Sequence, residues 1–167
     1  LLFFISFLFS QFDWQDNGIA IRQGVHIEWQ RTADIDQDGN FIFGWSDTRQ
    51  GNRNIYVQKT NNSGEKLWGE NGTIVAQTNG RQEDPILVSD DNGGAYIVWK
   101  NINASHYEQY NPDYEIYAQH ILSDGSLGWD GDQGIQLSST LGEPTWSEIC
   151  SDGQGGAYVI WKDLTVS

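Results

Sequence analysis

The chain has 167 residues and a formal net charge of −14 at neutral pH. This charge argues against nucleic acid as a partner, because phosphate neutralisation requires clustered Lys and Arg side chains. Eight Trp and nineteen Gly beside only three Pro are typical of many short strands joined by glycine turns. We therefore expect an all-β protein with a soluble, self-repelling surface.

The first ten residues, Leu1 to Ser10, are almost wholly apolar. A membrane-spanning helix takes about 20 such residues, so no membrane span is expected here. An apolar core that ends on a small residue and precedes a polar segment is typical of a secretory signal peptide. Because the chain also lacks Met, we interpret residues 1–10 as a truncated signal peptide and the whole as a fragment of an exported protein. An ordinary buried strand is the alternative.

From Trp14 onward the chain repeats itself. Two sets of tryptophans mark the repeat: Trp14, Trp68 and Trp129, each followed 31 or 32 residues later by Trp45, Trp99 and Trp161. Each member of the second set ends an apolar run that follows a turn rich in Asp and Gly. The period is 54 residues in the first unit and 61 in the second, which carries a seven-residue insertion after Trp99. Such periods are the sequence signature of repeat folds.

The second unit is predicted to contain four strands, at 85–89, 95–100, 115–122 and 135–138. The strand at 95–100 is apolar on both sides, with Ile97 and Trp99 on one face and Val98 on the other. This pattern indicates a strand that is covered on both faces of its sheet. Small antiparallel sheets of this kind, repeated about every 54 residues, predict a β-propeller with four-stranded blades. A two-sheet sandwich is the alternative.

The repeat divides residues 11–167 into about two and a half predicted blades. Residues 31–76 form one blade, residues 85–138 a second and residues 147–167 part of a third. Residues 14–30 are predicted to be the outer strand of a preceding or closing blade.

The first unit carries a longer motif as well. It is Trp45-Ser46-Asp47-Thr48-Arg49-Gln50-Gly51, followed by Ile55-Tyr56-Val57-Gln58 and then by Gly64, Trp68 and Asn71-Gly72. The pattern resembles secreted bacterial β-propeller repeat proteins, and the resemblance covers nearly all of the chain from Trp14. The second unit departs from it at Lys100-Asn101 and in the insertion. The resemblance implies fold far better than function, because many functions share propellers.

One turn has the composition of a cation site. Asp34, Asp36 and Asp38 alternate and are followed by Gly39, so their carboxylates could converge on calcium. An EF-hand is excluded, because its twelfth position is Trp45 rather than Glu. The run also resembles the calcium hairpins of some propellers. The alternative is a solvated turn in which Asp supplies only turn chemistry.

A second turn, at 89–96, is similar to the Asp-box of sialidase propellers, although its last two positions differ. In that family the box stabilises the fold. A sialidase would also need an arginine cluster and a Tyr/Glu pair, and the spacing of the five arginines here singles out no such cluster. His26, His106 and His120 share no metal-ligand spacing. These observations do not favour catalysis. An enzyme, either a propeller glycoside hydrolase or a lyase, is the alternative interpretation of the chain as a whole.

The insertion after Trp99 is the main candidate for ligand binding. His106, Tyr107, Glu108 and Tyr110 could form an aromatic and polar platform for a sugar or peptide. In the propellers that the chain resembles, the loop between the second and third strands lies on the face that receives ligands. The alternative is a solvent-exposed decoration.

Asp47 and Arg49 are expected on the same face as the insertion. They are a second candidate for ligand contact, with a structural role, tying a loop to the neighbouring blade, as the alternative. Trp45, Trp99, Trp161 and Cys150 are predicted to be core residues, because they lie in apolar strands.

Together these features predict an exported, non-catalytic module at the cell surface or outside the cell. Its expected partner is a glycan or a surface protein. No cofactor is required, and calcium is the one candidate. A purely structural repeat is a further alternative.

Overall fold

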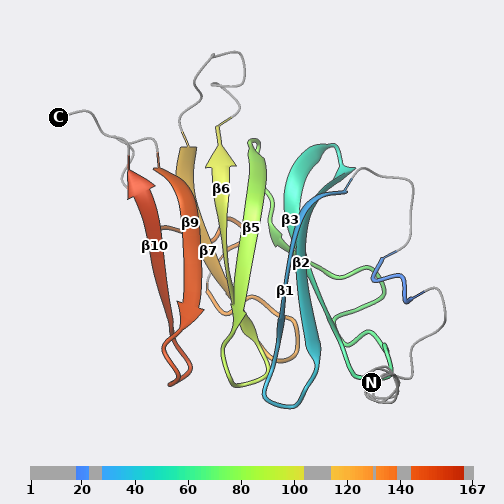
Figure 1. The fold of residues 1–167 in the computed structure, drawn as a ribbon. Helices are drawn as coiled ribbons and strands as arrows, with labels where there is room; N and C mark the ends of the chain where they lie inside the picture. Colours follow the sequence, from blue (N-terminus) through green and yellow to red (C-terminus); the bar gives the residue numbers. More distant parts are fainter. Residues whose placement is uncertain (1–17, 23–27, 104–113, 130, 139–143, 164–167) are drawn as a thin grey trace, which may run out of the picture.

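The computed structural model describes residues 18–22, 28–103, 114–129, 131–138 and 144–163. Its ten strands form three antiparallel sheets (Figure 1). The first sheet holds β1 (Glu28–Ile35), β2 (Phe41–Gln50), β3 (Asn52–Thr60) and β4 (Thr73–Ala76). The second holds β5 (Arg81–Ser89), β6 (Ala95–Ile102), β7 (Tyr114–Ile121) and β8 (Ile135–Gln136). The third is the hairpin of β9 (Pro144–Ser151) and β10 (Ala157–Asp163).

Strands follow chain order within each sheet, so each sheet is a simple meander. This confirms the all-β class and the four strands predicted for the second unit. Where the boundaries of β6, β7 and β8 differ from the prediction, they differ by one or two residues, whereas β5 begins at Arg81, four residues before the predicted start at Pro85. The ladder shifts register between Glu83 and Ile86, and Asp84 has a positive φ of 51°. Pro85 therefore lies in a bulge of an edge strand, where its missing N–H is tolerated.

The N-terminal predictions fall largely outside the described residues. Residues 18–22 form no strand, and the rest of 14–30 is described only from β1 onward. The predicted signal peptide, 1–10, lies outside the described part of the chain. Within that part, no helix is long and apolar enough to span a membrane.

The middle sheet lies between the other two. We call the face of each sheet that carries Trp45, Trp99 or Trp161 its front face, and the opposite face its back face. On the front of the second sheet, Trp99 joins a core cluster with side chains of the first sheet. On its back, Val98 is fully buried in a cluster that includes Trp161 of the third sheet. The prediction that β6 is covered on both faces is confirmed.

The first strand of each sheet contacts the first strand of the next, so β1, β5 and β9 are neighbours (Figure 1). Side chains of β1 satisfy the open edge of β5. Thr32 Oγ1 accepts a hydrogen bond from the Leu87 N–H (3.3 Å), and Asp34 Oδ2 accepts one from the Ser89 N–H (2.9 Å). Unpaired edge groups are thereby bonded, which also protects the edge from other chains.

The turn after each first strand is built by one aspartate, which is Asp36, Asp90 or Asp152. Asp90 Oδ1 accepts hydrogen bonds from two backbone N–H groups of its turn, at Asn92 and Gly94 (both 2.8 Å). Asp36 and Asp152 each do the same in their own turns. These aspartates therefore give the structural alignment of the three sheets.

The turns are also joined across the sheets. Lys59 Nζ donates to the Gly93 carbonyl (2.8 Å), and the Tyr96 hydroxyl donates to the Gly155 carbonyl (3.0 Å). Each bond runs from one sheet to the turn of the next. The glycine carbonyl at this turn position is thus a repeated docking point.

Removal of the Tyr96 hydroxyl tests this cross-sheet bond. We expect Tyr96→Phe to lower the free energy of unfolding by about 0.5–1.5 kcal/mol, because one part-buried hydrogen bond is lost. Urea denaturation of dilute protein measures the change. Tyr158→Phe is the matched control, because Tyr158 is the equivalent residue of the third sheet and is 66% exposed. Equal effects of the two changes would contradict the assignment.

Each four-stranded sheet braces its longest loop with a buried glutamine. Gln58 Nε2 donates to the Gly69 carbonyl (2.7 Å), while Gln58 Oε1 accepts from the Trp68 N–H (3.0 Å). Gln119 repeats both bonds in the second sheet, with Gly131 and Trp129. The connection from the third to the fourth strand is therefore held in the same way twice.

Each four-stranded sheet also contains a stacked Trp/Tyr pair. Trp45 and Tyr56 have ring centroids 6.1 Å apart, and Trp99 and Tyr117 repeat the spacing at 6.1 Å. Gly72 has a φ of +77°, and a Cβ on it would lie 2.4 Å from the Val57 carbonyl oxygen. A glycine is required there because the backbone approaches so closely.

Candidate functional site

Asp47 and Arg49, predicted to contact a ligand, form a compact ion pair at the end of β2. Asp47 Oδ2 accepts hydrogen bonds from Arg49 Nε (2.8 Å) and from Trp45 Nε1 (3.1 Å). The Arg49 guanidinium lies 3.8 Å from the Tyr56 ring centroid and donates to the Asn71 carbonyl (2.8 Å). The pair therefore ties the end of β2 to the loop between β3 and β4 of the same sheet.

The Asp47 side chain is 0% exposed, so its carboxylate has no surface to offer a ligand. Burial alone would raise its pKa, but hydrogen bonds from Arg49 and Trp45 outweigh burial and hold the pKa below its usual value. Arg22 Nε also lies 3.4 Å from Asp47 Oδ2. This arrangement favours a structural role for Asp47 and Arg49 over ligand contact. The pair ties a loop to its own sheet, rather than to the neighbouring blade.

The three aspartates of the predicted calcium turn are not brought together. Asp34 bonds to β5, and Asp36 bonds to its own turn and to Lys59 Nζ at 2.6 Å. Asp38 is exposed. Among the described residues, no group of three or more His, Cys, Asp or Glu could hold a metal ion. The arrangement matches the turn chemistry that was the alternative.

The predicted platform of His106, Tyr107, Glu108 and Tyr110 lies outside the described residues. The structure does describe the base of that insertion, where β6 ends at Ile102 and β7 begins at Tyr114. This end of the second sheet is also the end at which β2 turns into β3 in the first sheet (Figure 1).

An amide-rich cleft of about 350 Å³ opens at the same end, between the first and second sheets. It is lined by Gln50, Asn52, Asn54, Gln77, Thr78, Asn79, Asp132 and Gln133. The Gln77 N–H donates to the Asp132 carbonyl (2.8 Å), which joins the segment after β4 to the loop before β8. The cleft is therefore walled by both sheets.

A buried polar network supports the cleft from behind. Thr78 Oγ1 donates to Asn101 Oδ1 (3.3 Å), and Asn101 Nδ2 donates to Glu115 Oε2 (3.1 Å). Gln82, which is fully buried, also donates to Asn101 Oδ1 (3.3 Å). This network connects the cleft wall to both strands that border the insertion.

The cleft presents hydrogen-bonding groups that the described residues leave open. Asn54 is 1% exposed, and its buried Oδ1 has no hydrogen-bond partner among the described residues. The side-chain amides of Gln50, Asn79 and Gln133 make no hydrogen bond to the described part of the chain. The three open amides of Gln50, Asn79 and Gln133 are therefore the groups that could bond to the hydroxyls of a ligand.

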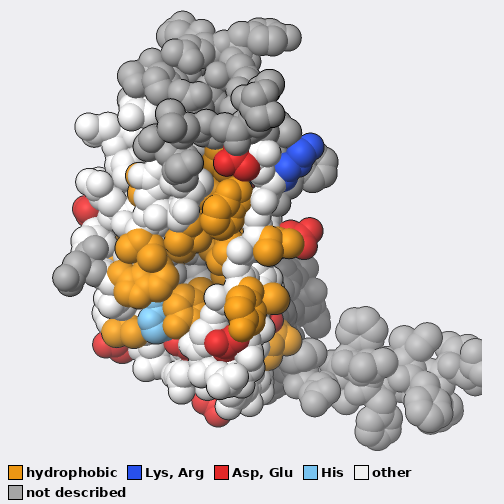
Figure 2. All heavy atoms as spheres, turned by 90° about the vertical axis from the view of Figure 1, so that its left-hand side faces the viewer, with side chains coloured by type: hydrophobic (Ala, Val, Ile, Leu, Met, Phe, Trp, Pro, Cys, Tyr) orange, Lys and Arg blue, Asp and Glu red, His pale blue; other side chains and the backbone are white. Residues whose placement is uncertain are grey.

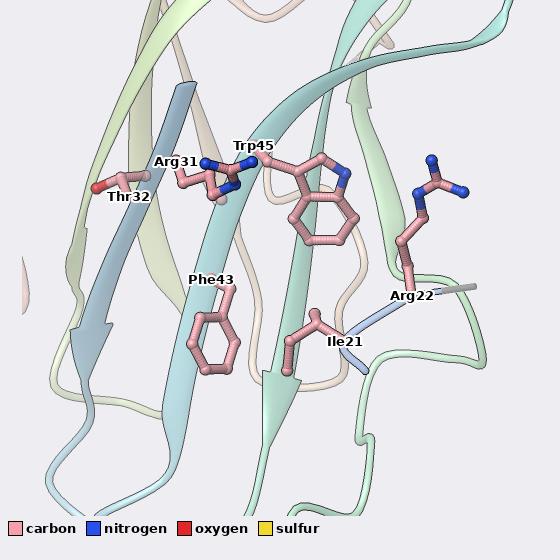
Figure 3. A pocket seen from close by; sticks show the side chains of 7 residues that line it. Ile21, Arg22, Arg31, Thr32, Phe43 and Trp45 are labelled. Carbon is pink, nitrogen blue, oxygen red and sulfur yellow. The ribbon is translucent and has the colours of Figure 1, made fainter. Parts of the chain in front are cut away.

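A smaller hollow, of about 220 Å³, lies on the front face of the first sheet. Phe43 and Trp45 of β2 line it together with Ile21 (Figure 3). It is mainly apolar. Its place on an end face of the stack distinguishes it from the amide-rich cleft.

Sequence reasoning missed the cleft because its residues come from three separate stretches, at 50–54, 77–79 and 132–133. The one available signal was the density of Asn and Gln in these connections. Comparison of the chain with protein-family models, curated proteins and solved structures found no match.

Proposed function

We propose that the chain is a non-catalytic binding module of the β-propeller type, acting outside the cell, whose amide-rich cleft binds a glycan. The observation that carries the proposal is the cleft itself, whose lining consists almost wholly of side-chain amides and includes Asn54, Gln77 and Asn79. The cleft lies at the same end of the molecule as the base of the insertion. The insertion is therefore a second candidate binding element beside the cleft. The insertion residues Tyr107 and Tyr110 then serve as aromatic contacts for sugar rings.

The chemistry of the lining selects a neutral, hydroxyl-rich ligand. A side-chain amide offers two donor hydrogens and an acceptor oxygen. It can therefore pair with a sugar hydroxyl, which also both donates and accepts hydrogen bonds. Among the described residues that line the cleft, Asp132 is the one charged residue. A strongly charged ligand would find little compensation there, whereas a glycan can bond to several amides at once.

The lining also favours binding over glycoside hydrolysis. Hydrolysis generally uses two carboxyl groups that flank the scissile bond. The described lining provides Asp132 alone. The propeller interpretation is supported by the sheets that stack in chain order, with β1, β5 and β9 as neighbours.

Binding to a glycan array, followed by calorimetry with the glycan that binds, tests the proposal. We expect Gln50→Ala with Asn79→Ala to weaken binding about 10- to 100-fold, because two ligand hydrogen bonds are lost. Tyr107→Ala with Tyr110→Ala is expected to weaken it similarly through lost ring contacts.

Gln154→Ala is the matched control, because Gln154 is an exposed amide in the turn of the third sheet. It should leave the dissociation constant unchanged. The proposal is wrong if neither double variant alters binding, or if no glycan binds while a surface protein does. A chain that binds neither would be a purely structural repeat.

A further inference from the structure

Asp132 differs from the other residues that line the amide-rich cleft, because its carboxylate only accepts hydrogen bonds. Asp132 is exposed, and its side chain makes no hydrogen bond or ion pair with the described part of the chain. In a chain with 23 acidic and nine basic side chains, an unpaired carboxylate is common in itself. Figure 2 shows several acidic side chains on the side of the molecule that the third sheet forms. The position of Asp132 in the repeat distinguishes it from these.

The loop that contains Asp132 occurs in both four-stranded sheets. In each sheet it runs from the glycine whose carbonyl bonds to the buried glutamine to a second glycine with a positive φ. In the second sheet these glycines are Gly131 and Gly134, and Asp132 directly follows the first of them. In the first sheet, Glu70 directly follows the corresponding glycine. Glu70 is therefore the counterpart of Asp132.

The counterpart has a cation beside it, whereas Asp132 does not. Lys66 Nζ donates to Glu70 Oε1 (3.0 Å) and to the Glu70 carbonyl (2.8 Å). In the second sheet, Leu127 takes the place of Lys66, because both residues form the same isolated bridge to the end of the third strand. A leucine cannot neutralise a carboxylate. The loop copy that walls the cleft thus keeps its negative charge, while the other copy is paired.

The backbone of this loop is fixed although the carboxylate is open. The Asp132 carbonyl accepts a hydrogen bond from the Gln77 N–H of the first sheet (2.8 Å). The preceding carbonyl, of Gly131, accepts one from Gln119 Nε2 (3.2 Å). Both bonds use main-chain oxygens, so the position of Asp132 is set while its side-chain oxygens stay available. A group that is placed before binding lowers the entropic cost of binding.

We propose that Asp132 is the specificity-determining residue of the cleft and that its carboxylate accepts hydrogen bonds from two adjacent hydroxyl groups of a sugar. The two carboxylate oxygens accept side by side, so the matching donors are vicinal hydroxyls in a gauche arrangement. The open amides of Gln133 and Asn79 then bond to the remaining hydroxyls. The assignment rests on the proposed glycan binding, and it narrows the ligand to glycans whose bound sugar keeps two free, adjacent hydroxyls.

A pair of hydroxyls fits this cleft better than an ammonium or guanidinium group does. An ion pair with an exposed carboxylate contributes little to affinity, because water and salt screen it. The other described residues of the lining are neutral, and their amide hydrogens are suited to hydroxyl oxygens rather than to a cation.

Calorimetry with the glycan that gives the strongest array signal, and with its monodeoxy analogues, tests the assignment. We expect Asp132→Asn to weaken binding about tenfold, because hydrogen bonds to a charged acceptor are stronger than those to a neutral one. Removal of either of two adjacent hydroxyls should weaken binding to the wild type about tenfold and have a much smaller effect on the variant. Higher salt should leave the wild-type dissociation constant unchanged.

Glu70→Gln is the matched control, because it removes the same charge at the equivalent loop position outside the cleft lining. It should leave the dissociation constant unchanged, and thermal unfolding checks that both variants remain folded. If Asp132→Asn has no effect while Gln50→Ala with Asn79→Ala weakens binding, the role of Asp132 is wrong and glycan binding stands. A strongest binder that carries an amino group, with an affinity that falls as salt rises, also overturns the assignment. The absence of any glycan binding overturns both proposals.

Discussion

Gly72→Ala is expected to lower the free energy of unfolding by about 2–5 kcal/mol. Gly72 has a φ of +77°, a conformation that costs a residue with a Cβ about 1–2 kcal/mol. The added Cβ would also lie 2.4 Å from the Val57 carbonyl oxygen and 2.8 Å from the Trp45 ring. Because backbone and a buried ring both resist displacement, overpacking adds to the backbone strain. Urea denaturation measures the total.

Gly69→Ala separates the two contributions. Gly69 lies three positions earlier with a φ of +74°, and a Cβ there would meet nothing within 4 Å. We expect this control to cost about 1–2 kcal/mol, the backbone contribution alone. If the two variants unfold at the same urea concentration, the close approach of Gly72 to the Val57 carbonyl and the Trp45 ring is not a constraint on the fold.

Asp47→Ala is expected to cost about 3–5 kcal/mol, because it leaves the Arg49 guanidinium without its buried partner. The indole N–H of Trp45 loses its acceptor at the same time. Asp38→Ala is the matched control, because Asp38 is exposed, and its effect should remain within about 0.5 kcal/mol. Comparable losses from both changes would show that Asp47 makes no buried ion pair.

The same carboxylate predicts a pH dependence. The pKa of Asp47 is lowered in the folded state from its ordinary value of 3.8. Its contribution is therefore complete above the unfolded-state pKa and is lost as the pH falls through the folded-state pKa. The difference in unfolding free energy between wild type and Asp47→Asn should stay constant from about pH 7 to 5 and shrink below about pH 4. A difference that grows on acidification would contradict the assignment.

The sheets could be predicted from the sequence because their signals are local. The alternation around Ile97 and Val98 indicated a strand buried on both faces, and the matched tryptophans placed its counterparts. The start of β5 was predicted wrongly at Pro85, because proline usually marks the end of a central strand. In an edge strand a bulge accommodates it, and such a bulge leaves no clear pattern in the sequence.

The role of single side chains depended on contacts between distant residues. Asp34 appeared to belong with Asp36 and Asp38, yet it bonds to Ser89, which lies 55 positions away. Cys150 was expected in the core, but its apolar strand is covered on one face only, and the thiol is exposed on the other. The amide-rich cleft likewise exists only once two sheets are side by side.

Sheets built from consecutive residues, each docked on the one before it, have a consequence for the history of such chains. Stability in this architecture is approximately a sum over units and over the junctions between neighbours. A unit can then be duplicated or deleted by recombination while the remaining junctions keep their contacts. Selection can also diversify the connection between β6 and β7 in one unit alone, since neither the ladders nor the junctions depend on its length.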